Sequence, residues 1–154
     1  MNKRIKQLLL YSKLTALVVK IDYSLAKKGF NETFQKVARK YYSVIKVQLD
    51  QIDQKKADEI IEIFSALDII CTWYPRKADC IHKTLIGYQL LRHMYDIPVE
   101  MVVGIRKFPF EAHAWLINNG DNFFETEMTS QYKIIYHSRN FVLEEANDLV
   151  STHD

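Results

Sequence analysis

The sequence predicts an α+β fold in which helices come first and a small antiparallel sheet follows. Apolar residues recur at helical spacings of three and four in the part of the chain before Pro98. After Pro98 they alternate with their neighbours, which is typical of strands. The chain holds only four glycines and three prolines, so these residues mark the boundaries between elements.

Four helices are expected before Pro98. Their expected ranges are residues 3–28, 31–47, 56–71 and 80–97. Gly29 ends the first helix, and residues 72–77 form a loop. Asp79 is a good N-cap for the fourth helix, which places Cys80 in its first turn, where backbone N–H groups have no partner inside the helix.

The part of the chain after Pro98 is expected to form strands and a last short helix. The expected strands are residues 99–105, 111–118, 121–127 and 132–137, and the helix covers residues 141–150. With 154 residues and 48% hydrophobic content, the chain is large enough to fold as a single domain around one core.

Cysteine usage and the N-terminal sequence indicate a cytoplasmic protein. Cys71 and Cys80 are the only cysteines, which argues against a disulfide framework and for a reducing compartment. The N-terminal apolar stretch lacks a small-residue cleavage site and is interrupted by Lys13 and Lys20. We therefore expect neither a signal peptide nor a segment that spans a bilayer.

The small net charge of +2 hides a strong asymmetry. Residues 1–50 hold eleven Lys and Arg against three Asp and Glu, a net charge of +8, which leaves −6 for the rest of the chain. This region is either a solvated basic helix face or a docking surface for an acidic partner or an anionic membrane. No nucleic-acid-binding motif accompanies the charge, so we do not expect a nucleic-acid partner.

The candidate active-site residues are Cys80 and His113. Cysteine attacks carbonyl groups as the thiolate, and the positive end of a helix dipole favours that form. His113 lies 33 residues later in the expected strand 111–118 and is a candidate base for the thiol. One cysteine, one histidine and a carboxylate beyond it are typical of a cysteine acyl-transfer enzyme. Cys71, on the apolar stripe of the preceding helix, is expected to serve packing.

The third member of the site depends on the turn between two strands. A three-residue loop at residues 118–120 would place Glu125 opposite His113, close enough to orient the imidazole. A two-residue Asn119-Gly120 turn would instead place Thr126 there and turn Glu125 away. We favour the loop and therefore Glu125. The alternative carboxylate, Asp121, would lie about 13 Å along the strand.

A metal site and a cofactor are not expected. His82 is the one histidine near both cysteines, but the spacing of Cys71, Cys80 and His82 is not a normal zinc spacing. Helix geometry also directs Cys80 and His82 to different faces.

The stretch 75–127 resembles the transglutaminase-like superfamily. The residues that carry the resemblance are Asp79-Cys80, the helix to Tyr95, Pro98-Val99, Val102-Val103-Gly104-Ile105 and Ala112-His113-Ala114-Trp115. The chain looks closest to the leader peptidases of lasso-peptide biosynthesis. This resemblance implies a transglutaminase- or papain-like fold, with a helical segment at residues 1–72 and a catalytic core at residues 73–154.

The resemblance also implies a function. In that family a Cys-His-Asp triad cleaves the leader from a ribosomally made precursor peptide. The matching positions here are Cys80, His113 and Glu125, the last being a Glu where the family has Asp. The Cys80 backbone N–H would help to hold the oxyanion, with Trp73 or Tyr74 as candidates for a second donor.

Partners follow from the same resemblance. The chain shows no leader-recognition domain, so we expect a separate leader-recognition protein, as well as the precursor peptide and an ATP-dependent lasso cyclase. Lys36, Arg39 and Lys40 form the densest basic cluster and are the expected docking site for the recognition protein. Two rival functions are acyl transfer to an amine by the same triad and a non-catalytic binding module.

Overall fold

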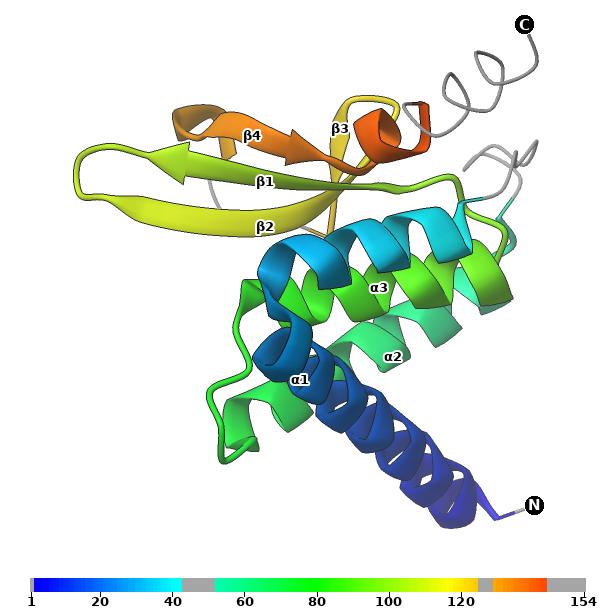
Figure 1. The fold of residues 1–154 in the computed structure, drawn as a ribbon. Helices are drawn as coiled ribbons and strands as arrows, with labels where there is room; N and C mark the ends of the chain where they lie inside the picture. The colour runs from blue at the N-terminus through cyan, green and yellow to red at the C-terminus, as the bar shows by residue number, and fades with distance from the viewer. Residues whose placement is uncertain (1, 43–51, 125–128, 144–154) are drawn as a thin grey trace, which may run out of the picture.

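The structure, a computed structural model of the 154-residue chain, describes residues 2–42, 52–124 and 129–143. Three long helices lie on one side of a four-stranded antiparallel sheet (Figure 1). The elements are α1 (Lys3–Tyr41), α2 (Gln54–Trp73), α3 (Cys80–Met94), β1 (Glu100–Arg106), β2 (Glu111–Asn118), β3 (Asp121–Phe123), a 3-10 turn η2 (Thr129–Gln131) and β4 (Lys133–His137). The predicted α+β class, with helices before strands, is confirmed.

The two helices expected at the N-terminus form one kinked element. Gly29 has φ of 77° and ψ of 174°, which breaks the helical geometry inside α1. A positive φ is readily adopted only by glycine, so the predicted boundary at Gly29 is correct although helical residues follow it at once. The described part of α1 ends at Tyr41, and residues 43–51 lie outside the described residues.

One apolar core joins all three helices to the sheet. Its largest fully buried side chains include Leu14 and Phe34 of α1, Leu67 of α2, Tyr88 of α3 and Met101 of β1. Full burial of an aliphatic or aromatic side chain of this size contributes roughly 1.5–3 kcal/mol. The core is therefore the main source of stability, and it fixes α3 between the other helices and the sheet.

Two glycines allow close packing around β1 and β2. A Cβ atom at Gly87 would lie 2.9 Å from the Leu116 side chain, so α3 approaches β2 as closely as it does because residue 87 lacks a side chain. A Cβ at Gly104 would lie 3.0 Å from the Trp115 ring and 2.8 Å from Tyr132. Both contacts lie beside the segment of β2 that carries His113.

Arg92 ties the end of the helical layer to the sheet. It is 5% exposed, its Nε donates to the Tyr41 carbonyl at 3.1 Å, and its Nη1 donates to the Val99 carbonyl at 2.6 Å. The guanidinium also lies over the rings of Tyr42 and Tyr88. These contacts join α1, α3 and the start of the sheet around one buried charge.

The β2–β3 turn differs from the expected three-residue loop. Asn118 pairs with Asp121, so only Asn119 and Gly120 lie in the turn, and both have positive φ, at 51° and 92°. This is the two-residue turn in which Asn-Gly is the preferred pair. The expected loop was wrong because Asn118 stays in the strand, where its side-chain amide donates to the Pro98 carbonyl at 3.1 Å.

The last elements are shorter or earlier than expected. β3 ends at Phe123, and Phe124 has a positive φ of 53°, which turns the chain away from the straight strand expected to residue 127. Residues 138–143 are helical, three residues earlier than the predicted start at 141. Residues 125–128 and 144–154 lie outside the described residues.

Candidate active site

Cys80 is the first residue of α3, as the sequence predicted. Asp79 precedes it as the N-cap, with an extended backbone. The Cys80 side chain is partly buried and packs against the edge of the core. The local sequence therefore places a thiol at the positive end of a helix, with solvent access on one side.

His113 lies in the middle of β2 and is 9% exposed. Its ring stacks on Trp115, with centroids 5.7 Å apart and planes 14° apart, and lies 5.5 Å from the Tyr132 ring. Because side chains alternate along a strand, His113 and Trp115 share one face of β2, whereas Ala114 and Leu116 face the core. The two aromatic neighbours hold the imidazole in one orientation.

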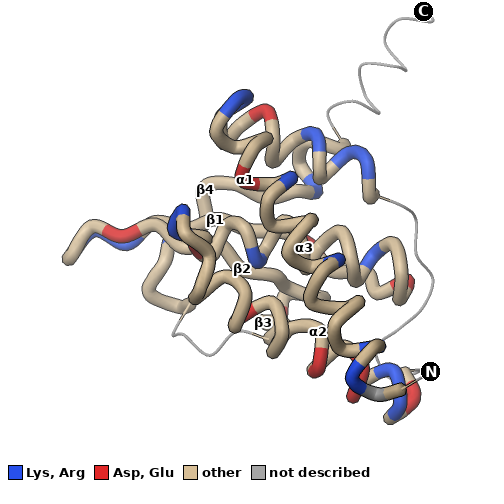
Figure 2. Tube along the Cα trace, turned by 90° about the horizontal axis from the view of Figure 1, so that it is seen from below, with Lys and Arg blue, Asp and Glu red and all other residues tan. Residues whose placement is uncertain are grey.

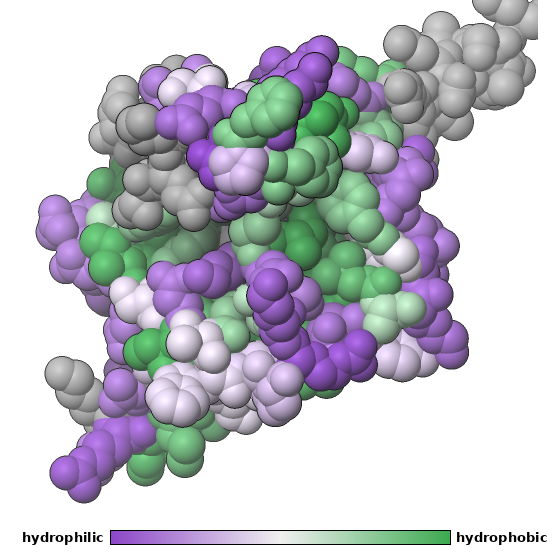
Figure 3. Space-filling view, turned by 90° about the vertical axis from the view of Figure 1, so that its left-hand side faces the viewer, coloured by the Kyte–Doolittle hydropathy of each residue, from purple (hydrophilic) through white to green (hydrophobic). Residues whose placement is uncertain are grey.

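Cys80 and His113 both line one cleft of about 840 Å³. Residues 111–116 of β2 all line the cleft, so both faces of that strand contribute residues to its wall. The opposite wall comes from α2 and the start of α3. The face that carries the β1–β2 turn is hollowed, with apolar surface in the recess and hydrophilic residues around it (Figure 3).

The cleft has one apolar wall and a charged rim. Phe64 and Phe124 stack at 4.9 Å beside Ile61, which forms a hydrophobic surface near Cys80. The Lys83 ammonium pairs with Asp68 at 2.6 Å on the rim. An extended peptide would find apolar contact for one side chain here and polar groups for its backbone.

Asp22 of α1 connects to the segment that leads into Cys80. Its Oδ2 accepts from the Tyr74 hydroxyl at 3.0 Å and lies 3.3 Å from Arg76 Nε. Its Oδ1 lies 3.5 Å from His82 Nε2. The Nδ1 of His82 accepts from the Asp79 backbone N–H at 3.2 Å, so the ring proton is on Nε2, facing Asp22. This network fixes the loop before α3 and the first turn of that helix.

The sequence-based prediction assigns no functional role to Asp22 or His82. The sequence nevertheless contains one feature that singles out each of these two residues. Asp22 is the single acid in the first 31 residues, on a helix otherwise rich in lysine. His82 stands three residues after the N-cap Asp79, which is the spacing of a capping box. Trp73 and Tyr74, the candidate second oxyanion donors, do not line the cleft, and the Tyr74 hydroxyl is bound to Asp22.

Cys71 belongs to the core, as expected. It is 4% exposed, and burial raises the pKa of its thiol. The charge on Lys83 lowers this pKa and the charge on Asp68 raises it, both by less than burial does. A protonated, enclosed thiol is a poor nucleophile. Both cysteines are free thiols.

Glu125 lies outside the described residues, so its role stays a prediction. The three-residue loop that had placed it opposite His113 is wrong. Continuing the observed register would place residue 126 there, but the positive φ of Phe124 interrupts the strand first. Asp121, the other carboxylate, pairs with Asn118 at the turn and does not line the cleft.

The described part of the chain holds neither a metal-binding cluster nor a membrane-spanning helix. Within residues 2–42, 52–124 and 129–143, no group of three or more His, Cys, Asp or Glu side chains is arranged to hold a metal ion. None of the helices described there has the length and apolar character needed to cross a membrane.

The sequence profile of the transglutaminase-like superfamily matches residues 32–137. This is well over half of the chain, and the protein belongs to that superfamily. The superfamily includes cysteine peptidases and acyltransferases. The matched region starts in the second half of α1 and contains α2, α3 and the sheet, so it also includes helices that we had assigned to the N-terminal segment. Comparison with curated proteins and with solved structures found no match.

Proposed function

We propose that the protein is a cytoplasmic cysteine peptidase that removes the leader from a ribosomally made lasso precursor peptide. The observation that carries the proposal is the cleft shared by Cys80 and His113, because it joins a thiol at a helix start to a histidine held by aromatic rings. Membership of a superfamily that includes cysteine peptidases supports the same chemistry.

The proposed reaction uses groups of this chain alone. His113 takes the proton from the Cys80 thiol, and the thiolate attacks the carbonyl carbon at the leader–core junction. The Cys80 backbone N–H donates to the oxyanion. The tetrahedral intermediate collapses, the C–N bond breaks, and protonated His113 gives its proton to the departing amine. Water, deprotonated by His113, then hydrolyses the thioester, which releases the leader and regenerates the thiol. Glu125 is our candidate for orienting His113.

The cleft fits an extended peptide better than a small molecule. Its two ends differ: the Phe64 and Phe124 rings offer apolar contact, and Glu111, paired with Arg106, lies at the other side beside His113. A chain lying between them would pass its backbone over Cys80. The peptide's new N-terminal amine would then be the group that an ATP-dependent lasso cyclase joins to an acidic side chain.

Recognition of the leader would come from a separate leader-recognition protein. Lys36, Arg39 and Lys40 are exposed on the second half of α1 and line a hollow of about 570 Å³. Lys and Arg residues gather on this part of α1 in Figure 2. Tethering of the leader by a docked partner would raise the effective concentration of the scissile bond by orders of magnitude. Reversal of these three charges should weaken partner-stimulated cleavage and leave the basal rate unchanged.

A peptide-library experiment tests the proposal without a known precursor. The wild-type protein and the Cys80→Ala variant are each incubated with a library of proteome-derived peptides, and new N-termini are counted by mass spectrometry. New N-termini that form only with the wild-type protein support a peptidase. If added glycine amide becomes joined to the new C-termini instead of water, the protein is an acyltransferase. No Cys80-dependent product of either kind would contradict the proposal.

A further inference from the structure

The outer face of α1, before the kink at Gly29, exposes several large apolar side chains at both ends of a stretch of small residues. These large side chains are Ile5, Leu8, Leu9, Val19 and Tyr23, which are 49%, 72%, 46%, 48% and 61% exposed. The opposite side of the same helix, with Leu14, Val18 and Ile21, is buried in the core. Exposed large apolar side chains gathered on one helix face are typical of an interaction surface.

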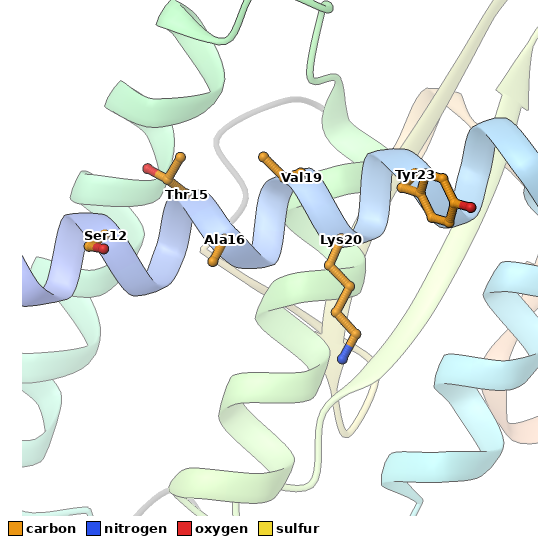
Figure 4. Close-up of a pocket in the computed structure, with 6 residues that line it drawn as sticks. All are labelled: Ser12, Thr15, Ala16, Val19, Lys20 and Tyr23. Atoms are coloured by element: carbon orange, nitrogen blue, oxygen red, sulfur yellow. The ribbon is translucent and has the colours of Figure 1, made fainter.

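A shallow groove of about 650 Å³ lies in the middle of this outer face. Two of the residues that line it, Ser12 and Ala16, have small side chains (Figure 4). Thr15 and Val19 point to one side of the helix and Lys20 to the other, so one edge of the groove is uncharged and the other is charged. Small residues in the groove let the backbone of another helix approach closely.

The charged edge is a row of lysines. Lys6, Lys13, Lys20 and Lys27 recur every seven residues and are all exposed. Residues seven apart lie almost above one another on a helix, so these ammonium groups form a line along the groove. The single acid in this part of the chain, Asp22, is 13% exposed and bound to the segment before α3. No ion pair found among the described residues neutralises this lysine row.

We propose that this outer face is the docking surface for an amphipathic helix of a partner protein that carries acidic residues along one edge. Its apolar residues fill the groove, and its acidic residues, repeated every seven positions, pair with the lysine row. None of the helices that the structure describes carries acidic residues at a seven-residue spacing, so a second copy of this chain offers no such row there. A membrane surface is the other possible occupant, and the vesicle measurement described below separates it from an acidic helix.

The docked helix leaves the cleft open. Among the described residues, the walls of the cleft contain no residue of α1. The outer face also ends before residue 32, where the match to the superfamily begins. The inference does not depend on the proposed peptidase activity, because it concerns binding alone.

The test uses a synthetic, fluorescein-labelled peptide of about three heptads with leucine on its apolar face and glutamate along one edge. Fluorescence anisotropy with the full-length protein should show saturable binding that weakens as salt is added. A peptide with lysine in place of glutamate should bind at least about tenfold more weakly. Lys13→Glu combined with Lys20→Glu should weaken binding of the glutamate peptide by about tenfold or more and improve that of the lysine peptide.

Matched control variants distinguish binding at this surface from nonspecific hydrophobic binding. Val19→Ser should weaken binding, whereas Ile135→Ser, which alters an equally exposed (48%) side chain on β4, should not. Thermal unfolding of each variant checks that the fold is retained. Equal binding of the two peptides, no saturable binding of the glutamate peptide, or unchanged binding after the lysine reversal would overturn the proposal.

Two further measurements test whether the outer face of α1 binds a membrane or a second copy of the chain instead of an acidic helix. Co-sedimentation with phosphatidylglycerol vesicles, lost in the double lysine variant while the glutamate peptide does not bind, would assign the face to a membrane. Dimerisation in analytical ultracentrifugation that Val19→Ser abolishes would assign it to a second copy. Either result would overturn the acidic-helix proposal.

Discussion

Cys71 and Cys80 lie nine residues apart and differ in burial and in their position relative to a helix end and to the cleft. Cys71, in the last part of α2, is 4% exposed, and burial raises the pKa of its thiol. Cys80 opens α3, is partly exposed and faces the cleft that His113 also lines. The pair shows that position relative to a helix end and to a cavity, and not residue type, separates a packing cysteine from a candidate nucleophile.

The largest effect is expected from Cys80→Ala. Loss of the nucleophile should lower turnover by about a thousandfold or more, with little change in unfolding temperature because few core contacts are lost. Product formation from a cleaved peptide and thermal unfolding are the two measurements. Full activity of this variant in a folded protein would remove Cys80 from the chemistry.

Glu125→Gln should have the next largest effect on turnover, because His113 would lose its orienting charge while side-chain size is kept. Asp121→Asn is the control: its carboxylate lies at the β2–β3 turn and should matter little. The ratio of kcat to KM for both variants measures the difference. The reverse order, an inactive Asp121→Asn and a normal Glu125→Gln, would move the third role to Asp121.

Asp22→Asn should slow turnover severalfold at unchanged KM, because the carboxylate positions His82 and the loop before Cys80 without lining the cleft. The alkylation rate of the Cys80 thiol should fall with turnover, which a loss of stability alone would not cause. Asp58→Asn, on the exposed start of α2, serves as the control. Unchanged kcat and alkylation rate in Asp22→Asn would limit this network to stability.

Cys71→Ala should leave turnover intact and lower the free energy of unfolding by about 1 kcal/mol, as a small core truncation does. Cys71→Ser should cost more, because it buries a hydroxyl group in an apolar site. Urea denaturation of both variants provides the comparison. An inactive but folded Cys71→Ala would reverse the roles of the two cysteines.

A smaller effect is expected at alkaline pH. Since burial raises the folded-state pKa of Cys71 above its ordinary value of 9.0, the unfolded chain loses the thiol proton first. The stability that comes from this thiol is complete below pH 9 and is lost as the pH rises further. The wild-type protein should therefore lose more stability above that pH than Cys71→Ala. Parallel pH profiles of the two proteins would contradict the assignment of a buried, protonated thiol.

The features that the sequence predicted well depend on local patterns. The break at Gly29, the cap at Asp79 and the start of α3 at Cys80 follow from backbone chemistry within a few residues. The division between helices and strands follows from the change of apolar period at Pro98. These signals are enough to define the fold class and to place the candidate nucleophile.

The features that the sequence missed depend on contacts between distant segments. The sequence alone does not favour the two-residue Asn119-Gly120 turn over a three-residue loop. The hydrogen bond that keeps Asn118 in the strand goes to the Pro98 carbonyl, 20 residues away, and no local pattern predicts it. The contact between Asp22 and His82 joins α1 to α3, and no local sequence pattern predicts that these two residues meet. Pairings of this kind are decided by tertiary packing.

The most direct test of the central claim is the selectivity of thiol alkylation near neutral pH. The native protein is treated with iodoacetamide, modified residues are mapped by mass spectrometry, and peptide cleavage is followed in the same samples. We predict rapid modification of Cys80 with parallel loss of activity, and protection of Cys71 until the protein is unfolded in urea. Faster modification of Cys71, or full activity after Cys80 is completely modified, would contradict the account.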